Sequence, residues 1–350
     1  MEKYKQTHYW KRGVTVLLES FEKPLNNISE QNGRGTITKE YIEINGVRQG
    51  LIIESLNQGN PLLLFLHGGP GFPAYPVIKA HGVRLEQFFD VCYWDQRGTG
   101  MSYYDKESNE PLSVEQLVGD TIQVVNYLRE KYAQDKVFLL GHSWGSYLGS
   151  LAAHKNPDLF HAYIGVGQVG SAKESEHETY NFILKTATNK NDKRAMKQIK
   201  NVTFDENYYK NHSYGAVRAK FTNKYGGGFK RSGYSNLENL RHIFSCPNYT
   251  FKERVNIFRG SFSSYQSLGH VMATTDLVEL VPTLDLPVFI LQGQHDYQTT
   301  LTQAKRFYES IKAPYKKMFT FENSSHTPFI EETERFYKIM QDEVVGNYVI

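Results

Sequence analysis

A serine stands between two glycines immediately after an apolar run. Residues 137–140 read Val-Phe-Leu-Leu, and residues 141–145 read Gly-His-Ser-Trp-Gly. The pattern G-x-S-x-G at a strand end is typical of a nucleophile elbow, a sharp turn that lifts a serine clear of a sheet. Residues 146–156 predict a helix that ends before Pro157, because proline disfavours the helical conformation in the preceding residue. This order predicts Ser143 as a nucleophile; the plainer alternative is a turn serine that caps a helix.

A serine hydroxyl is a weak nucleophile and needs a base that an acid orients. Where a strand–turn–helix carries the serine, the chain order is serine, acid, histidine. Asp296 follows the apolar run 286–292, whereas Asp285 precedes it and would lie at the wrong end of the sheet. Of the 12 histidines, His326 alone follows Asp296, just past the next predicted strand. We therefore expect Ser143, Asp296 and His326 to form a catalytic triad, although a loop position alone would also explain the acid and the histidine.

The negative charge that develops on a substrate oxygen needs hydrogen-bond donors, each worth about 3–4 kcal/mol. One is expected from the backbone N–H that follows the nucleophile, on Trp144. The other is expected from the glycine-rich loop 67–71 (His-Gly-Gly-Pro-Gly). Pro70 has no N–H, so Gly68 or Gly69 must donate, and we favour Gly69. This loop lacks the spacing and the lysine of a phosphate-binding loop.

The elements that must position these residues alternate between strands and helices. An Asn45-Gly46 turn predicts a hairpin, and apolar periodicity predicts a long helix capped by Ser113. Together these patterns predict an α/β fold with a mostly parallel, doubly wound sheet. The predicted strands span 36–44, 47–56, 62–66, 89–94, 137–140, 162–166, 286–292 and 317–321, and the long helix spans 113–132.

The alternation stops after residue 170. Residues 171–285 are polar, aromatic and helical in pattern, which predicts a helical cap or lid inserted before the last two strands. We assign 36–170 and 286–350 to the catalytic domain and 1–35 to a peripheral N-terminal segment, in which 26–35 reads as a loop.

Composition excludes several other classes. The 350-residue chain has a net charge of +3 without a long Lys/Arg run, which argues against nucleic-acid binding. Its two cysteines, Cys92 and Cys246, are far apart, which fits a reducing compartment better than a disulfide framework. The apolar stretch 14–18 is too short for a signal peptide or a membrane span. We expect a cytoplasmic protein without cofactor or metal that acts on a small molecule or a short peptide.

These motifs together resemble the α/β-hydrolase superfamily and, within it, the proline iminopeptidase family. The resemblance rests on residues 67–71, 94–102 (WDQRGTGMS) and 141–146. It implies the α/β-hydrolase fold and cofactor-free release of an N-terminal residue, often proline, from short peptides. It also implies the same triad and an oxyanion hole formed by Gly69 and Trp144.

An aminopeptidase must hold a free α-ammonium group, and a sheltered carboxylate is the simplest partner for it. Glu174, Glu176 and Glu178 open the cap and are candidates, although the positive end of a helix also favours acids there. Gln168 follows the strand 162–166 and either lines the pocket or is a buried, satisfied amide. Two other functions stay open. One is a carboxylesterase or other small-molecule hydrolase with the same machinery, and the other is a non-catalytic binding protein on this fold.

Overall fold

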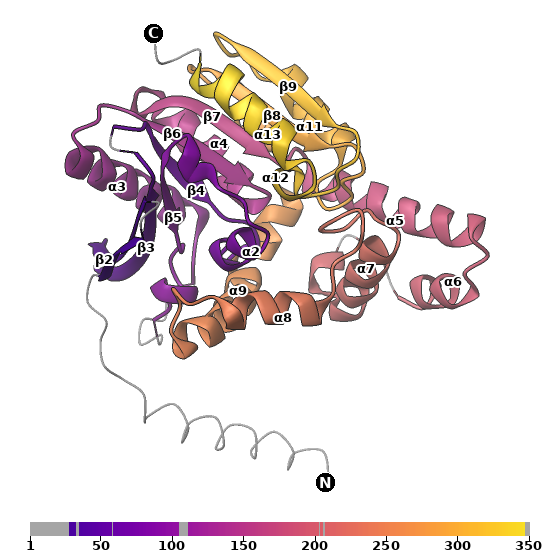
Figure 1. Ribbon diagram of the computed structural model, residues 1–350. Coiled ribbons are helices and arrows are strands. Elements are labelled where there is room, and N and C mark those ends of the chain that lie inside the picture. Colours follow the sequence, from indigo (N-terminus) through magenta and orange to yellow (C-terminus); the bar gives the residue numbers. More distant parts are fainter. Residues whose placement is uncertain are drawn as a thin grey trace.

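The computed structural model describes residues 28–32, 35–57, 59–104, 111–202, 204–205 and 207–346. A nine-stranded sheet in the order β1-β2-β3-β5-β4-β6-β7-β8-β9 forms its centre (Figure 1). The six strands β5, β4, β6, β7, β8 and β9 pair in parallel with their neighbours. The pairs β1–β2, β2–β3 and β3–β5 at the other edge are antiparallel. The strands are β1 (Ile28–Asn32), β2 (Gly35–Ile44), β3 (Val47–Ser55), β4 (Leu62–Leu66), β5 (Asp90–Trp94), β6 (Val137–His142), β7 (Phe160–Val166), β8 (Val288–Gly293) and β9 (Lys316–Phe321).

Helices cover both faces of this sheet. The helices of the described residues are α2 (Tyr75–Ala80), α3 (Val114–Tyr132), α4 (Trp144–Lys155), α5 (Ala172–Asn189), α6 (Lys193–Lys200), α7 (His212–Lys224), α8 (Asn236–Ser245), α9 (Phe251–Thr274), α10 (Leu277–Leu280), α11 (Leu301–Ser310), α12 (Pro328–Glu331) and α13 (Thr333–Ile339). The predicted α/β-hydrolase architecture is confirmed, with β8 and β9 following a run of helices.

The central strands are continuous apolar runs because both of their faces are covered. Every residue of β4, β5, β6 and β8 is buried. Successive side chains of a strand point to opposite faces. On β4, Leu62, Leu64 and Leu66 therefore join the core under α3, α4 and α11, whereas Leu63 and Phe65 join the core under α2, α12 and α13.

At the N-terminal edge of the sheet, the predicted hairpin turn is confirmed and the predicted loop is wrong. At the predicted hairpin turn, Asn45 and Gly46 both have positive φ, at 48° and 71°, as a two-residue turn of type I′ requires. Most of 1–35 lies outside the described residues. The loop predicted over 26–35 is wrong at residues 28–32, which form β1 and pair with β2. The sequence of this edge strand (ISEQN) is polar and shows no apolar alternation. Only its backbone pairing with β2 identifies it as a strand.

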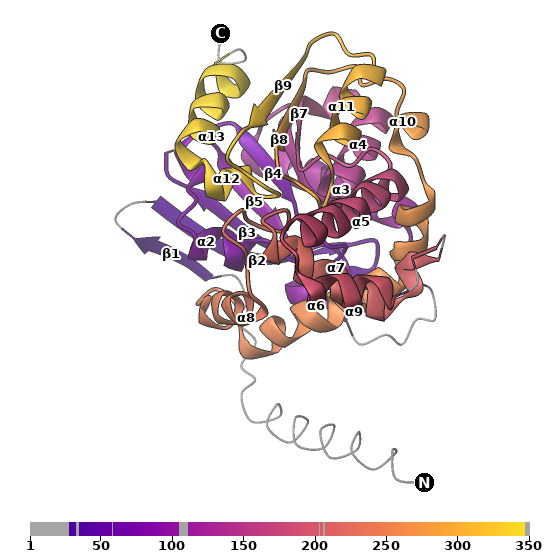
Figure 2. The same ribbon diagram turned by 90° about the vertical axis from the view of Figure 1, so that its right-hand side faces the viewer.

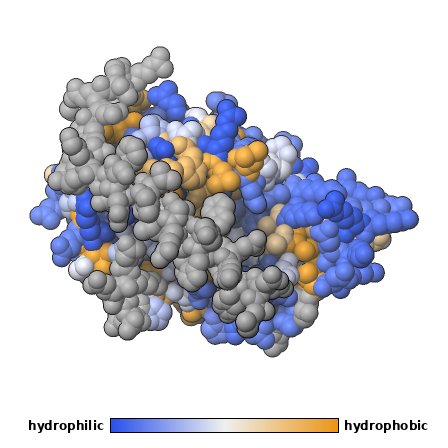
Figure 3. Space-filling view, turned by 90° about the horizontal axis from the view of Figure 1, so that it is seen from below, coloured by the Kyte–Doolittle hydropathy of each residue, from blue (hydrophilic) through white to orange (hydrophobic). Residues whose placement is uncertain are grey.

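The six helices α5 to α10, here called the cap helices, lie between β7 and β8 in the chain and to one side of the sheet (Figures 1 and 2). The helices α5, α6 and α7 share a small core that includes Ile183, Ile199 and Phe221. All six cap helices begin after a side chain that accepts a hydrogen bond from a backbone N–H of the first turn, which stabilises the helix starts despite their polar composition. The projecting end of α5 and α6 is hydrophilic (Figure 3).

Two sequence features have plain structural counterparts. Cys92 and Cys246 are free and buried. Within the described residues, the helices are too short or too polar to cross a membrane.

Candidate active site

The serine of the G-x-S-x-G motif occupies a strained turn. Ser143 lies between β6 and α4 with φ 56° and ψ −122°, a conformation that non-glycine residues rarely adopt outside functional sites. Its N–H donates to the Val166 carbonyl at 2.9 Å. A Cβ on Gly145 would overlap the carbonyl oxygen of Leu66. The glycine therefore lets α4 pass directly against β4, and the elbow holds the serine at the carboxyl ends of the strands.

The predicted acid and base are paired. His326 Nδ1 lies 2.8 Å from Asp296 Oδ2, and both side chains are buried. Asp296 follows β8, and its carboxylate also accepts hydrogen bonds from the side chains of Gln292 and Thr299 and from the backbone N–H groups of Gln298 and Thr299. Burial raises the pKa of Asp296, but His326 and these donors outweigh burial and hold the pKa below its ordinary value. The carboxylate is therefore ionised and fixed in orientation.

A second histidine, His142, packs against His326 and stays uncharged. The rings of His142 and His326 lie 4.7 Å apart, and His142 Nε2 lies 3.0 Å from the His326 carbonyl oxygen. Burial and the neighbouring His326 lower the pKa of His142 to about 3. His142 is therefore neutral at physiological pH, and it links the serine turn to the histidine loop.

The expected oxyanion donors lie on two backbone segments near Ser143. Gly69 has φ +121°, and a Cβ there would lie 2.6 Å from Gly71 N and 2.8 Å from Phe72 N, so the loop requires glycine. A Cβ on the adjacent Gly68 would come within 3.1 Å of Ser143 Cβ, which shows how closely the loop approaches the serine. Trp144 begins α4, so its N–H belongs to the first turn and has no partner within the helix.

One buried glutamine, to which the sequence pattern assigned no role, ties these two segments together. Gln96 Nε2 donates to the His67 carbonyl at 3.0 Å, and its backbone N–H donates to His67 Nε2 at 3.0 Å. Its Oε1 accepts from the Trp144 indole at 3.0 Å. Burial lowers the pKa of His67 to about 4, so His67 is the neutral acceptor that this geometry needs. The signal lay in the stretch 94–102, but only the fold places its glutamine between the loop and the elbow.

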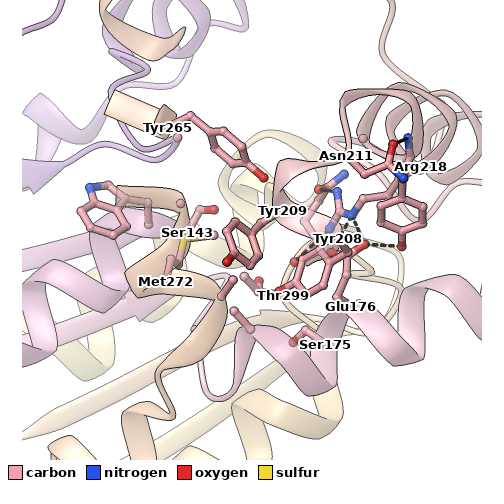
Figure 4. Close-up of a pocket in the computed structure, with 18 of the residues that line it drawn as sticks. Ser143, Ser175, Glu176, Tyr208, Tyr209, Asn211, Arg218, Tyr265, Met272 and Thr299 are labelled. Carbon is pink, nitrogen blue, oxygen red and sulfur yellow. Dashed lines mark hydrogen bonds and ion pairs between the residues drawn. The ribbon is translucent and has the colours of Figure 1, made fainter. Parts of the chain in front are cut away.

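A cavity of about 450 Å³ opens at Ser143. Gly69, Ser143 and Trp144 line it from the sheet side. The cap side contributes hydroxyl-bearing aromatic and polar side chains, namely Tyr208, Tyr209, Asn211, Tyr214, Arg218 and Tyr265. In the view of Figure 4, Ser143 lies at one end and Glu176 with Arg218 at the other. The site thus joins a nucleophile to a polar, aromatic recess under the cap helices.

Comparison with known proteins identifies the family. Residues 85–333 match the family model described as serine aminopeptidase, S33. The chain is 32% identical over 300 residues to the probable aminopeptidase YbaC of Bacillus subtilis (strain 168), which covers 86% of this chain and 93% of that protein. It is 25% identical over 319 residues to the proline iminopeptidase of Heyndrickxia coagulans, with 87% and 98% covered. This chain belongs to the serine aminopeptidase S33 family.

Solved structures agree at the level of the fold. VinJ superposes with a TM-score of 0.65 at 20% identity over 89% of this chain and 99% of that chain. The proline iminopeptidase of Mycobacterium smegmatis superposes with a TM-score of 0.61 at 17% identity, with 88% and 98% covered. The S33 member described here is therefore a hydrolase with the α/β-hydrolase fold.

Glu176 is the one acidic side chain among the described residues that line the cavity. Both of its oxygens accept from Arg218 Nε, at 2.7 and 2.8 Å, and Oε1 also accepts from the Tyr214 hydroxyl at 2.5 Å. Burial lowers the pKa of Arg218, but Glu176 and Tyr214 outweigh burial and raise it above its ordinary value. Arg218 also donates to Gln298 Oε1 at 2.5 Å. Glu176 and Arg218 thus form an ion pair in which each charge is offset by the other.

The other three residues suggested for substrate binding do not line the cavity. Glu174 is exposed in the first turn of α5, and Glu178 accepts a hydrogen bond from Gln303 Nε2 at 2.9 Å. Gln168 is fully buried, accepts from the Tyr163 hydroxyl at 2.7 Å and donates to the Val169 carbonyl at 2.9 Å. Gln168 therefore has the structure of a satisfied core amide, the alternative interpretation of its position.

Proposed function

We propose that this S33 family member is a serine aminopeptidase that releases an N-terminal residue from short peptides. The observation that carries the proposal is the strained Ser143, which lines the cavity, in the same part of the fold as the Asp296–His326 pair. A Cβ on Gly167 would lie 3.0 Å from His326 Cε1, and the preceding residue, Val166, binds the Ser143 N–H. The imidazole and the serine therefore share one small region at the carboxyl ends of β6, β7 and β8.

The proposed chemistry follows from the tautomer that Asp296 selects. With its proton held on Nδ1 by the carboxylate, His326 has a free lone pair on Nε2 and acts as the base. Nε2 takes the proton of Ser143 as Oγ bonds to the substrate carbonyl carbon, and the N–H groups of Gly69 and Trp144 stabilise the oxygen anion. When the C–N bond breaks, the proton passes from Nε2 to the leaving amine. Water then adds to the acyl-enzyme by the same route, and Ser143 recovers its proton.

The recess at the far end of the cavity supports a substrate with a free amino group. Glu176 Oε2 accepts one hydrogen bond and a carboxylate oxygen can accept two, so one acceptor position remains for an ammonium group. Tyrosine rings also attract a cation through their faces, by about 0.5–2 kcal/mol, and Tyr208, Tyr209 and Tyr265 line the cavity. Together these features fit an ammonium group of the substrate. The α-nitrogen of an N-terminal residue is two bonds from the carbonyl carbon that Ser143 attacks, so Glu176 binds it only if the substrate brings the scissile carbonyl toward this recess.

A carboxylesterase is the second candidate, and one observation favours it. Because Arg218 neutralises Glu176, the recess has no excess negative charge with which to select a cation. An uncharged ester would enter without that requirement.

Initial rates on a small panel test the proposal. The panel contains prolyl, alanyl and phenylalanyl chromogenic amides, their N-acetylated forms, and p-nitrophenyl acetate and butyrate. The aminopeptidase proposal predicts cleavage of the free-amine amides, loss of cleavage on N-acetylation, and loss in Ser143→Ala. Ester turnover without amide turnover contradicts the proposal and indicates the esterase.

A paired substitution tests the recess. Glu176→Gln with Arg218→Met removes the ion pair as a unit and leaves no buried charge without a partner. The expected result is a KM for free-amine amides at least about tenfold higher, because one charge-assisted hydrogen bond is lost. Glu178→Gln is the matched control, since Glu178 contacts Gln303 outside the cavity. An equal KM in the paired variant and the control contradicts a role of Glu176 in ammonium binding.

A further inference from the structure

A second cluster of chemically active side chains lies outside the cavity, where α2 meets α8. His81, Glu238 and His242 each offer one ligand atom, and these atoms lie within 4.8 Å of one another. His81 directly follows α2, and Glu238 and His242 are four residues apart on α8 and share one face of that helix. All three side chains are half-buried. The cluster thus bridges a helix that covers the sheet and a cap helix.

Each imidazole is oriented by a hydrogen bond at its other nitrogen. His81 Nδ1 lies 2.9 Å from the Val77 carbonyl, so it carries the proton and leaves Nε2 with a free lone pair. His242 Nδ1 lies 3.1 Å from the Tyr234 hydroxyl. Histidines that bind metals almost always have such a partner on the second nitrogen, because it fixes the tautomer and the ring orientation.

The cluster already holds a positive charge. Lys230 Nζ lies 2.8 Å from Glu238 Oε1 and 3.3 Å from His81 Nε2. An imidazole nitrogen that accepts from an ammonium group is unprotonated, which is the form that binds a metal ion. Nε2 of His81 and Oε1 of Glu238 therefore face a position that a cation occupies.

We propose that His81, Glu238 and His242 bind Zn²⁺ or a similar divalent transition-metal ion in place of the Lys230 ammonium group. Two imidazoles and one carboxylate form a donor set that suits Zn²⁺, whereas Mg²⁺ and Ca²⁺ prefer oxygen ligands throughout. Zn²⁺ binds these donors at about 2.0–2.2 Å in tetrahedral geometry, which places ligand atoms about 3.4 Å apart. The cluster must therefore contract by roughly 1 Å, and the lysine side chain must swing away. A water molecule completes the fourth position.

The proposed metal site is connected to the loop that carries His326. This connection is the same whichever substrate the enzyme cleaves. Lys230 ends a short segment whose carbonyls face the loop of His326. The Gly228 carbonyl accepts from Ser325 Oγ at 2.6 Å and from His326 N at 3.4 Å. The Phe229 carbonyl accepts from Thr327 Oγ1 at 2.8 Å. Release of Lys230 by a metal ion thus acts on the segment that supports the histidine loop.

The experiment is a Zn²⁺ titration of the full-length protein, stripped with a chelator beforehand, in competition with a chromophoric chelator. The proposal predicts one equivalent of bound Zn²⁺, and His81→Ala and His242→Ala each lower the affinity at least about 100-fold. His177→Ala is the matched control, because His177 is exposed on α5 outside the cluster. Affinities of the two cluster variants within threefold of the control overturn the proposal.

Lys230→Ala keeps the test informative if a histidine variant folds poorly. This substitution removes the ammonium group that competes with the metal ion and repels it. Zn²⁺ should therefore bind at least about tenfold more tightly. A gain of affinity cannot arise from misfolding. An affinity for Zn²⁺ that Lys230→Ala leaves unchanged or lowers contradicts the displacement of the ammonium group.

Discussion

Asp296→Asn tests the orientation of the proposed catalytic base, His326, by replacing one carboxylate oxygen with an NH₂ group. Asp296 Oδ1 accepts the backbone N–H groups of Gln298 and Thr299 at 2.7 and 3.0 Å. The asparagine carbonyl must keep this role, so its NH₂ group replaces Oδ2. That group then faces His326 Nδ1, at 2.8 Å in the native enzyme, and the amide of Gln292, at 2.9 Å.

The magnitude follows from the tautomer that the amide forces. A donor at this position requires an acceptor at Nδ1, so His326 carries its proton on Nε2 and cannot take the proton of Ser143. Loss of the correct tautomer in a Ser-His-Asp triad lowers kcat by about 10⁴-fold, or about 5.4 kcal/mol in the barrier. The opposed NH₂ groups of the asparagine and Gln292 cost about 1–3 kcal/mol of unfolding free energy.

The assay is kcat and KM on the best substrate of the panel, with a denaturant melt to show that the variant is folded. Asp285→Asn is the matched control, because Asp285 is exposed at the opposite end of β8, and it should leave kcat within about twofold. A folded Asp296→Asn enzyme whose kcat falls less than tenfold would refute the assignment of Asp296 as the orienting acid.

Three further changes probe the scaffold. Gln96→Leu removes the link between the Trp144 indole and the glycine loop and should lower kcat about 10–100-fold with little change in KM, as the loss of one or two oriented hydrogen bonds predicts. Asp120→Ala leaves the buried Arg97 guanidinium, held at 2.5 and 2.8 Å, without its partner and should lower the unfolding free energy by about 3–5 kcal/mol in urea melts. Burial raises the pKa of Asp95 to about 7. Between about pH 4 and pH 7 the native state therefore binds more protons than the unfolded chain does. The free energy of unfolding then falls as the pH rises, by at most about 4 kcal/mol. Asp95→Asn lacks this loss, and its stability relative to the wild type should increase between pH 5 and pH 8.

Each of these three has an outcome that contradicts it. An unchanged kcat in Gln96→Leu shows that the loop holds its position without the glutamine. An Asp120→Ala protein within 1 kcal/mol of the wild type means that the pair contributes no more than a surface ion pair. Parallel stability curves for wild type and Asp95→Asn between pH 5 and pH 8 show that Asp95 titrates as an ordinary carboxyl group.

Local constraints explain why much of the sheet and the serine turn could be predicted from the sequence. Gly141 is required by backbone contacts with Gly145 and Ser146, a few residues away, so part of the motif is explained by its own neighbours in sequence. Gly145 is required by the close approach of Leu66, which the apolar run before the glycine loop supplies. Buried parallel strands such as Leu62–Leu66 are uniformly apolar, which makes them visible without knowledge of their partners. The polar edge strand Ile28–Asn32 lacks such a pattern and was missed.

The cavity lining was harder to predict because it depends on the rotation of a single helix. Glu174 and Glu178 are four residues apart and share one face of α5, whereas Glu176 projects from the opposite face. The sequence supplied all three acids, but only the packing of α5 against α7 and α9 decides which face is turned inward. Likewise, His81 and His242 are far apart in the sequence, and only the contact between α2 and α8 brings them together.

The central claim is that Ser143 is the nucleophile, and covalent labelling tests it most directly. The folded protein is treated with a fluorophosphonate, and the adduct is mapped by peptide mass spectrometry while residual activity is followed. The account predicts one adduct, on Ser143, that forms in proportion to the loss of activity and is absent from Ser143→Ala. Full labelling at another residue, or complete inactivation with Ser143 unmodified, contradicts it.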